Sequence, residues 1–409
     1  MTTVAHPGDS LSGRERLVYI LVLGALTALG PFTIDLYLPA FPVLESDMHV
    51  SAAAIQLTLT GTTIGFAVGQ LLVGPWSDKV GRRLPLILAT GLHIAASMGA
   101  AVSPDITWLA VFRILQGFGA AAGGVVAMAM VRDLFGGRPL VRMLSRLALV
   151  SGLAPVLAPV IGSQLLSIMP WRGIFWVLAG YGAVVLAAVW FLIVETRPAE
   201  RRLDAGHSTL RDRYRAVLTD RVFVGTAIVG GMTFSGLFAY LSASPFLFQQ
   251  VYAFDAQQYG LLFAVNSLGV VFGVQASARL TKYLGPQWIL VGTTTAMLVL
   301  GALIVVLDIA GAGLWGILIP LWFFIACCGF SFPCIQVLGL NMHGNEAGTA
   351  ASLLGAVNFG MAGIISPIVG ILGVSNAIPM GAVMIGTSLI SVIVLWFVVR
   401  PRSVPALTN

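Results

Sequence analysis

The sequence predicts an all-α integral membrane protein with twelve transmembrane helices in two pseudo-symmetric halves of six. Of the 409 residues, 58% are hydrophobic and only 9% are charged, whereas soluble domains carry about 25% charged residues. The mean hydropathy is +0.94. A bilayer-spanning helix needs about 20 apolar residues, and twelve runs meet this need: 17–40, 51–75, 84–103, 106–131, 140–168, 171–194, 222–250, 257–278, 287–309, 313–341, 347–373 and 377–399.

The first apolar run looks like a signal sequence, because Arg14 and Arg16 precede it. It is longer than an ordinary signal core, and further spans follow it directly. We therefore expect it to be kept as the first transmembrane helix.

The basic residues predict the orientation of the chain in the membrane. Of the 22 lysines and arginines, 20 lie at the N-terminus, in the loops after even-numbered spans or at the C-terminus. The opposite loops carry acids, and Arg172 is their only cation. Cytoplasmic loops are the ones enriched in Lys and Arg, so we expect both termini to be cytoplasmic.

Residues 195–221 form the longest polar stretch, with seven arginines and five acids. We interpret it as a solvated cytoplasmic linker between an N-terminal half, 1–194, and a C-terminal half, 222–409. Two sequence patterns occur in both halves. Pro39 in the first span corresponds to Pro245 in the seventh. A G-x6-P-x2-G pattern occurs at Gly152, Pro159 and Gly162 and again at Gly360, Pro367 and Gly370. Parallel halves of this kind occur in secondary transporters, whose substrate site lies between them.

Two charges interrupt the apolar spans of the first half. Asp35 shares a helix face with Gly24, Thr27 and Pro31, and Arg113 shares one with Gln116, Gly117 and Ala120. These faces are small or polar, so both charges are expected to face the interior of the bundle.

Asp35 and Arg113 lie at similar predicted depths, so they could interact. One interpretation is a buried ion pair that only orients helices. The other is that Asp35 takes up and releases a proton, because intramembrane ionisable residues are generally functional. Burial raises the proton affinity of a carboxylate and a nearby arginine lowers it. Small rearrangements could therefore change the proton affinity of Asp35.

The loop between the second and third spans carries a family motif. It reads GPWSDKVGRR and resembles the signature loop of the major facilitator superfamily, roughly G-x-L-x-D-R-x-G-R-R, with Trp76 and Lys79 as departures. Gly81 permits a tight turn, and Asp78 and the basic residues can pair or interact with helix ends. The resemblance implies a cytoplasmic gating loop made by Gly74, Asp78, Lys79, Gly81, Arg82 and Arg83.

Three further stretches resemble the proton-linked drug exporters of this superfamily. RILQG, with Arg113, Gln116 and Gly117, is similar to their fourth-helix motif. The segment 151–162 resembles their antiporter motif, carried here by Gly152, Pro155, Pro159 and Gly162. DLYLPAFP, residues 35–42, is similar to the first-helix signature of the Bcr/CflA subfamily, which includes bicyclomycin, chloramphenicol and florfenicol exporters.

This resemblance implies a monomeric multidrug efflux antiporter of the bacterial inner membrane, which exchanges hydrophobic drugs for protons and confers antibiotic resistance. Asp35 and Arg113 would serve proton and substrate coupling in a central cavity. Further residues could line that cavity: Tyr37, His93, Phe238, Tyr240, Asn266, Gln336 and Asn358. A lone membrane histidine or amide can equally be a hydrogen-bonded packing residue, so both interpretations stay open for His93 and the amides.

Two alternative functions remain to be weighed. The first keeps the fold but changes the cargo to a sugar, amino acid or short peptide. The second is a membrane enzyme or receptor, which the five scattered histidines do not support, because they form no catalytic cluster. The glycine-rich segment 119–124 lacks a Walker lysine and a preceding strand. We therefore expect no enzymatic activity, cofactor, metal or nucleic-acid partner.

Overall fold

The structure is a computed structural model that describes residues 7–198, 210–340 and 347–404. Within these residues, twelve helical segments are long and apolar enough to cross a membrane, which confirms the predicted number of spans. Residues 199–209, the middle of the predicted linker, lie outside the described residues, as do the two ends of the chain at 1–6 and 405–409.

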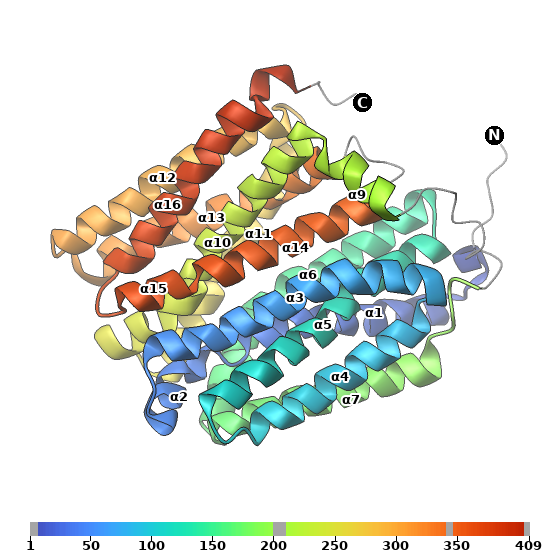
Figure 1. Cartoon of the computed structure of the whole chain (residues 1–409), viewed down its shortest axis with the longest axis horizontal. Helices are drawn as coiled ribbons and strands as arrows, with labels where there is room; N and C mark the ends of the chain where they lie inside the picture. Colours follow the sequence, from blue (N-terminus) through green and yellow to red (C-terminus); the bar gives the residue numbers. More distant parts are fainter. Residues whose placement is uncertain (1–6, 199–209, 341–346, 405–409) are drawn as a thin grey trace.

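The first six spans build one half of the bundle (Figure 1). Their helices, with the short α2 and two single turns of 3-10 helix, are η1 (Pro7–Ser10), α1 (Gly13–Asp35), η2 (Leu38–Ala40), α2 (Phe41–Met48), α3 (Ala52–Val80), α4 (Arg83–Ala101), α5 (Ile106–Leu134), α6 (Gly137–Leu166) and α7 (Trp171–Leu192).

The last six spans build the other half (Figure 1). A short helix, α9, precedes them, and two of the helices end in a turn of π-helix. The elements are α9 (Leu210–Leu218), α10 (Arg221–Phe246), η3 (Leu247–Val251), α11 (Ala256–Leu280), α12 (Pro286–Ile309), α13 (Gly313–Leu340), α14 (Ala347–Ile365), α15 (Pro367–Leu372), α16 (Ile378–Val394), η4 (Leu395–Val399) and η5 (Pro401–Ser403).

Two spans are broken where the sequence analysis expects continuous helices. Helix α1 ends at Asp35 because Pro39, four residues later, has no N–H to donate to the Asp35 carbonyl. The same deficit at Pro367 leaves the carbonyl of Gly363 without its helical donor, and α14 gives way to α15 there. Beyond the break, the first span continues through η2 and α2 to Met48, past its expected end at residue 40.

The two halves meet along α3 with α14 and along α6 with α11. We call the end of the bundle at which α1 begins and the last span ends the inner end, and the opposite end the outer end. Figure 1 shows α10, α12 and α16 diverging from the helices of the first half toward the inner end.

Side-chain amides join the halves at the outer end. Gln56 Nε2 donates to the Ser242 carbonyl at 3.0 Å. Gln249 Nε2 donates to the Pro39 carbonyl at 3.1 Å, and Gln250 Nε2 donates to Glu45 Oε2 at 2.7 Å. These bonds hold the outer end closed.

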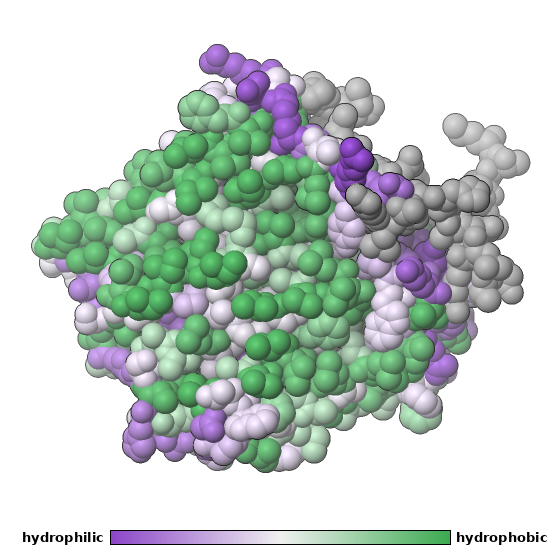
Figure 2. All heavy atoms as spheres, viewed as in Figure 1, coloured by the Kyte–Doolittle hydropathy of each residue, from purple (hydrophilic) through white to green (hydrophobic). Residues whose placement is uncertain are grey.

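The surface matches a bilayer-spanning bundle. Figure 2 shows apolar side chains covering the face in view, with polar side chains gathered toward the two ends. Arg172, the one cation of the predicted outer loops, pairs with Asp47 at 2.9 Å and stacks on Trp171. Its charge is therefore neutralised locally, and the positive charge remains concentrated at the inner end.

Candidate transport site

Asp35 lies at the break that ends α1. The residue is buried, with 5% of its surface exposed, and its carboxylate makes no hydrogen bond or ion pair with any residue that the structure describes. A buried carboxylate is costly unless it is paired, protonated or hydrated. The position therefore suits a group that binds a proton or a ligand in turn.

Arg113, on α5, is fully buried and has a different set of partners. Its guanidinium lies over the ring of Tyr37, 4.1 Å from the ring centroid, and its Nη1 donates to Gln116 Oε1 at 2.5 Å. Its Nε and Nη2 are buried and have no hydrogen-bond partner among the described residues. The structure thus does not join Asp35 and Arg113 in an ion pair, but it places Tyr37, two residues after Asp35, against the arginine.

A chain of hydrogen bonds leads from Arg113 into α4. Gln116 Nε2 donates to Ser97 Oγ at 2.7 Å, and Ser97 Oγ donates to the His93 carbonyl at 2.7 Å. The His93 ring Nδ1 is 3.3 Å from the Gln116 carbonyl, whereas its Nε2 is buried and finds no hydrogen-bond partner in the described part of the chain. The fourth-helix motif therefore forms a buried polar network within the first half, and His93 belongs to it.

Glycines bring the helices around this network into contact. A Cβ at Gly117 would overlap the Thr62 carbonyl, so glycine lets α5 pack directly on α3. Tyr37 completes this corner by hydrogen-bonding Thr58 Oγ1 at 2.6 Å. The α3–α5 contact thus holds Arg113 over the ring of Tyr37.

Some residues of the predicted antiporter motif pack tightly against neighbouring helices, and others do not. A Cβ at Gly162 would overlap the Leu36 carbonyl, beside the break at Asp35. The Pro159 carbonyl is against Gly260 of α11, whereas Pro155 is half-buried. Gly152 is exposed and has no atom within 4 Å of a Cβ built on it. Gly162 and Pro159 therefore pack tightly against α1 and α11, whereas Gly152 makes no close contact in this conformation.

The second half presents aromatic and amide groups toward Asp35. Tyr240 of α10 and Tyr259 of α11 both lie within electrostatic reach of the Asp35 carboxylate. The Tyr240 hydroxyl accepts a hydrogen bond from Asn266 at 3.0 Å, and its ring stacks on Phe263 at 5.5 Å. The Asp35 carboxylate of one half is thus close enough to these two tyrosines of the other half to interact with them electrostatically.

A cluster of phenylalanines crosses between the halves. Phe66 of α3 stacks on Phe359 of α14, with ring centroids 4.9 Å apart. Phe359 also packs edge-on against Phe234 and Phe238 of α10, and Phe332 of α13 meets Phe234. These rings form an apolar zone shared by both halves.

The two remaining predicted cavity residues lie elsewhere. Asn358 is half-buried beside Gly230, and its buried Oδ1 has no hydrogen-bond partner within residues 7–198, 210–340 and 347–404. Gln336 is exposed near the inner end of α13 and takes no part in the buried clusters.

The predicted gating loop is held by a charge network at the inner end. Gly81 adopts φ +99°, which confirms the tight turn. Arg82 is 4% exposed and pairs with Asp78 at 2.7 Å and with Asp133 at 2.9 Å. Burial acts to lower the pKa of Arg82, but the hydrogen bonds and charges of these two acids outweigh it and raise that pKa. Gly74 lies within α3, packed near Val125.

Residues of the predicted linker complete this network. Glu195 accepts from the backbone N–H groups of Arg82 and Arg83 at 2.8 and 3.1 Å. Arg197 pairs with Asp78 at 3.1 Å. Arg83 also donates to the Trp190 carbonyl. Neither Glu195 nor Asp133 was predicted from the sequence. The signal that could have identified them is that each is an acid at the inner end of a span, where the neighbouring loops are rich in arginine.

We expect Arg82→Gln to destabilise the protein, because Asp78, Asp133 and the turn would lose their shared partner. Removing one member of a buried charge network costs about 2–4 kcal/mol, the lower part applying because Asp78 is partly exposed. Thermal unfolding in detergent should show a lower Tm. Lys79→Gln, at an exposed position in the last turn of α3, is the matched control and should leave Tm unchanged. Equal Tm values for the two variants would contradict a stabilising role of the network.

Comparison with known sequences gives the family. The sequence model of the Major Facilitator Superfamily matches residues 23–367. The chain belongs to the major facilitator superfamily. It is therefore a multi-pass membrane transporter rather than an enzyme, and the predicted fold is confirmed.

Full-length relatives carry transporter and drug-resistance names. The uncharacterized MFS-type transporter YdgK of Bacillus subtilis is 36% identical over 96% of this chain and 98% of its own length. A bicyclomycin resistance protein homolog of Haemophilus influenzae is 30% identical, covering 94% and 96%. The multidrug resistance protein MdtL of Escherichia coli is 27% identical, covering 95% and 97%.

A solved structure confirms the arrangement of the helices. The xylose transporter XylE of Escherichia coli, in a partially occluded inward-open conformation, superposes with a TM-score of 0.75 over 96% of this chain and 99% of that one. The sequence identity is 12%, so the likeness concerns the fold alone.

Proposed function

We propose that this transporter is a proton-coupled antiporter of the Bcr/CflA type, which exports hydrophobic, drug-like molecules across the bacterial inner membrane by alternating access. The observation that carries the proposal is the buried carboxylate of Asp35 at a helix break, which has no ionic partner among the described residues and lies within electrostatic reach of Tyr240 and Tyr259 of the opposite half. Intramembrane carboxylates of this kind mark proton and substrate pathways.

The separation of Asp35 from Arg113 supports proton exchange. Arg113 is held by Tyr37 and Gln116, so its charge does not neutralise the carboxylate in this conformation. Asp35 is consequently stabilised by a proton or by a bound ligand. Competition between the two for one site would couple outward drug movement to inward proton movement.

The surroundings of the site support apolar cargo. Tyr240, Phe263 and the phenylalanines around Phe359 offer large flat apolar surfaces, and a few polar groups lie among them. Pockets for drug-sized ligands combine such apolar walls with few convergent polar groups. The names of two relatives, one for bicyclomycin resistance and one for multidrug resistance, point in the same direction.

The proposed orientation makes this an inward-facing conformation. The basic residues concentrate at the inner end, which places that end and both termini in the cytoplasm. The amides of Gln56, Gln249 and Gln250 close the periplasmic side. Export requires these bonds to break while the inner ends of the halves approach. We propose that one chain suffices for this cycle.

Everted membrane vesicles test the proposal. Their lumen is acidified by respiration, and a pH-sensitive dye reports proton release as chloramphenicol, florfenicol, bicyclomycin or a lipophilic cation is added. We expect at least one of these drugs to release protons only from vesicles that contain the protein. Sugars, amino acids and short peptides are tested in the same assay. A response to one of these metabolites alone, with insertion verified by immunoblot, would replace the drug exporter with a metabolite carrier.

A further inference from the structure

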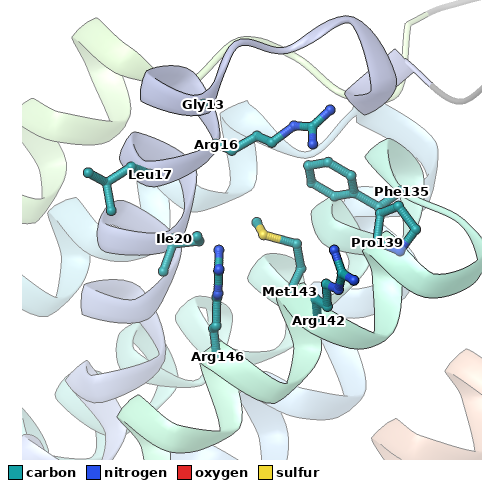
Figure 3. Close-up of a pocket in the computed structure, with 9 residues that line it drawn as sticks. All are labelled: Gly13, Arg16, Leu17, Ile20, Phe135, Pro139, Arg142, Met143 and Arg146. Atoms are coloured by element: carbon teal, nitrogen blue, oxygen red, sulfur yellow. The ribbon is translucent and has the colours of Figure 1, made fainter.

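A pocket of about 440 Å³ lies at the inner end of the first half, apart from the proposed transport site. Figure 3 shows it between the first turns of α1 and α6, beside the connection from α5. Its lining residues are Gly13, Arg16, Leu17, Ile20, Phe135, Pro139, Arg142, Met143 and Arg146.

The pocket is strongly basic. Three of its nine lining residues are arginines and none is acidic, and Figure 3 shows the arginine side chains arranged around Met143. Arg142 and Arg146 are exposed, and neither makes an ion pair with any residue that the structure describes. Arg16 donates to the Gly8 carbonyl at 3.3 Å and adds its charge.

The start of α6 adds to this positive potential. The helix runs for 30 residues, and its N-cap Gly136 provides no side-chain hydrogen bond to the first turn. The free N–H groups of a helix N-terminus favour anions. The effect of a helix N-terminus falls off within its first turn, so an anionic group between Arg142 and Arg146, in the second and third turns, would be attracted chiefly by the two guanidinium groups.

The walls indicate which anion this is. Leu17, Ile20 and Met143 give the pocket an apolar wall beside the arginines (Figure 3). On α6, the spacing of Arg142, Arg146, Leu149 and Leu153 puts all four on one face, and both leucines are exposed, Leu149 at 62%. A free phosphate cannot make apolar contacts with such a strip, whereas the acyl chain of a lipid can.

We propose that this pocket binds the phosphate headgroup of an anionic phospholipid of the cytoplasmic leaflet, with an acyl chain along Leu149 and Leu153. Arginine recognises phosphate through paired N–H groups, and basic pockets between helices on the cytoplasmic side suit anionic headgroups. The proposal uses the predicted orientation of the chain, but it is independent of the cargo and of proton coupling.

Native mass spectrometry and thermal unfolding of the purified full chain test this site. The wild-type protein should retain added phosphatidylglycerol in preference to phosphatidylcholine, and phosphatidylglycerol should raise its Tm. Attraction of about 1 kcal/mol for each basic residue near a lipid surface predicts that Arg142→Gln/Arg146→Gln retains the anionic lipid at least tenfold less.

The matched control removes two charges from the same end of the bundle. Arg279→Gln/Lys282→Gln changes exposed residues outside the pocket and should retain phosphatidylglycerol as the wild type does. Arg142→Lys/Arg146→Lys keeps both charges and the fold but loses the paired N–H geometry, so its retention should be intermediate.

Three results would overturn the proposal. Equal loss in the two glutamine variants would assign the effect to general surface charge. Equal retention of phosphatidylcholine and phosphatidylglycerol would remove the need for an anionic group. Competition by inorganic phosphate or glycerol 3-phosphate at equal concentration would assign the pocket to a soluble anion instead of a lipid.

Discussion

Asp35→Asn is expected to abolish drug-driven proton release while leaving the protein in the membrane. Asparagine is nearly isosteric with aspartate but cannot exchange a proton, and no residue that the structure describes forms an ion pair with Asp35 whose loss would disturb the fold. In the everted-vesicle assay the dye response to a transported drug should fall to the level of vesicles without the protein.

Asp105→Asn provides the matched control for this change. Asp105 caps the N-terminus of α5 by accepting from Thr107 N–H and Trp108 N–H, and asparagine caps helices equally well. The control should transport like the wild type. Full drug-driven proton movement by Asp35→Asn would eliminate Asp35 as the proton-exchanging group, and another intramembrane group would then have to carry the proton.

Gly162→Ala is expected to reduce transport at least tenfold and to lower stability. The added Cβ would overlap the carbonyl of Leu36, and a backbone atom cannot turn away as a flexible side chain can. Helix α6 would have to move away from the break that positions Asp35. Inserting a methyl group into such a tight contact costs about 1–3 kcal/mol. Initial rates of drug uptake into everted vesicles and the Tm in detergent measure the two effects.

Gly152→Ala is the control on the same helix and in the same motif. Nothing lies within 4 Å of its Cβ position, and alanine favours a helix over glycine by about 1 kcal/mol. Its Tm and transport should equal or exceed those of the wild type. Equal loss of transport in both variants, with normal Tm for Gly152→Ala, would contradict our interpretation and show that Gly152 is needed in another conformation of the cycle.

The sequence predicts the spans well because each is a local property. A run of apolar residues must cross the bilayer as a helix whatever its neighbours do, so the number of spans follows from hydropathy alone. The prolines are equally local, although their consequence was missed: Pro39 ends α1 at Asp35, and Pro367 interrupts the eleventh span.

The partners of the site residues could not be predicted in the same way. Asp35 and Arg113 have similar depths, but the rotation of α1 and α5 relative to each other decides whether their side chains meet. That rotation depends on close packing at Gly117 and Gly162, and the result is that Arg113 stacks on Tyr37. Likewise, nothing in the local sequence pairs Glu195 with the turn after α3, more than a hundred residues earlier.

The sequence by itself determined that the protein lies in a lipid bilayer, that it has twelve spans, that the chain turns tightly at Gly81 and that two charges are buried. These properties follow from hydropathy and backbone restrictions, which act within a few residues. Only the tertiary structure decided that the outer end is closed, that Asp35 lies within electrostatic reach of Tyr240 and Tyr259 with no cation paired to it among the described residues, and that Arg142 and Arg146 share a pocket with α1. These features depend on how helices distant in sequence pack and rotate against each other, and such packing is set by many small contacts at once.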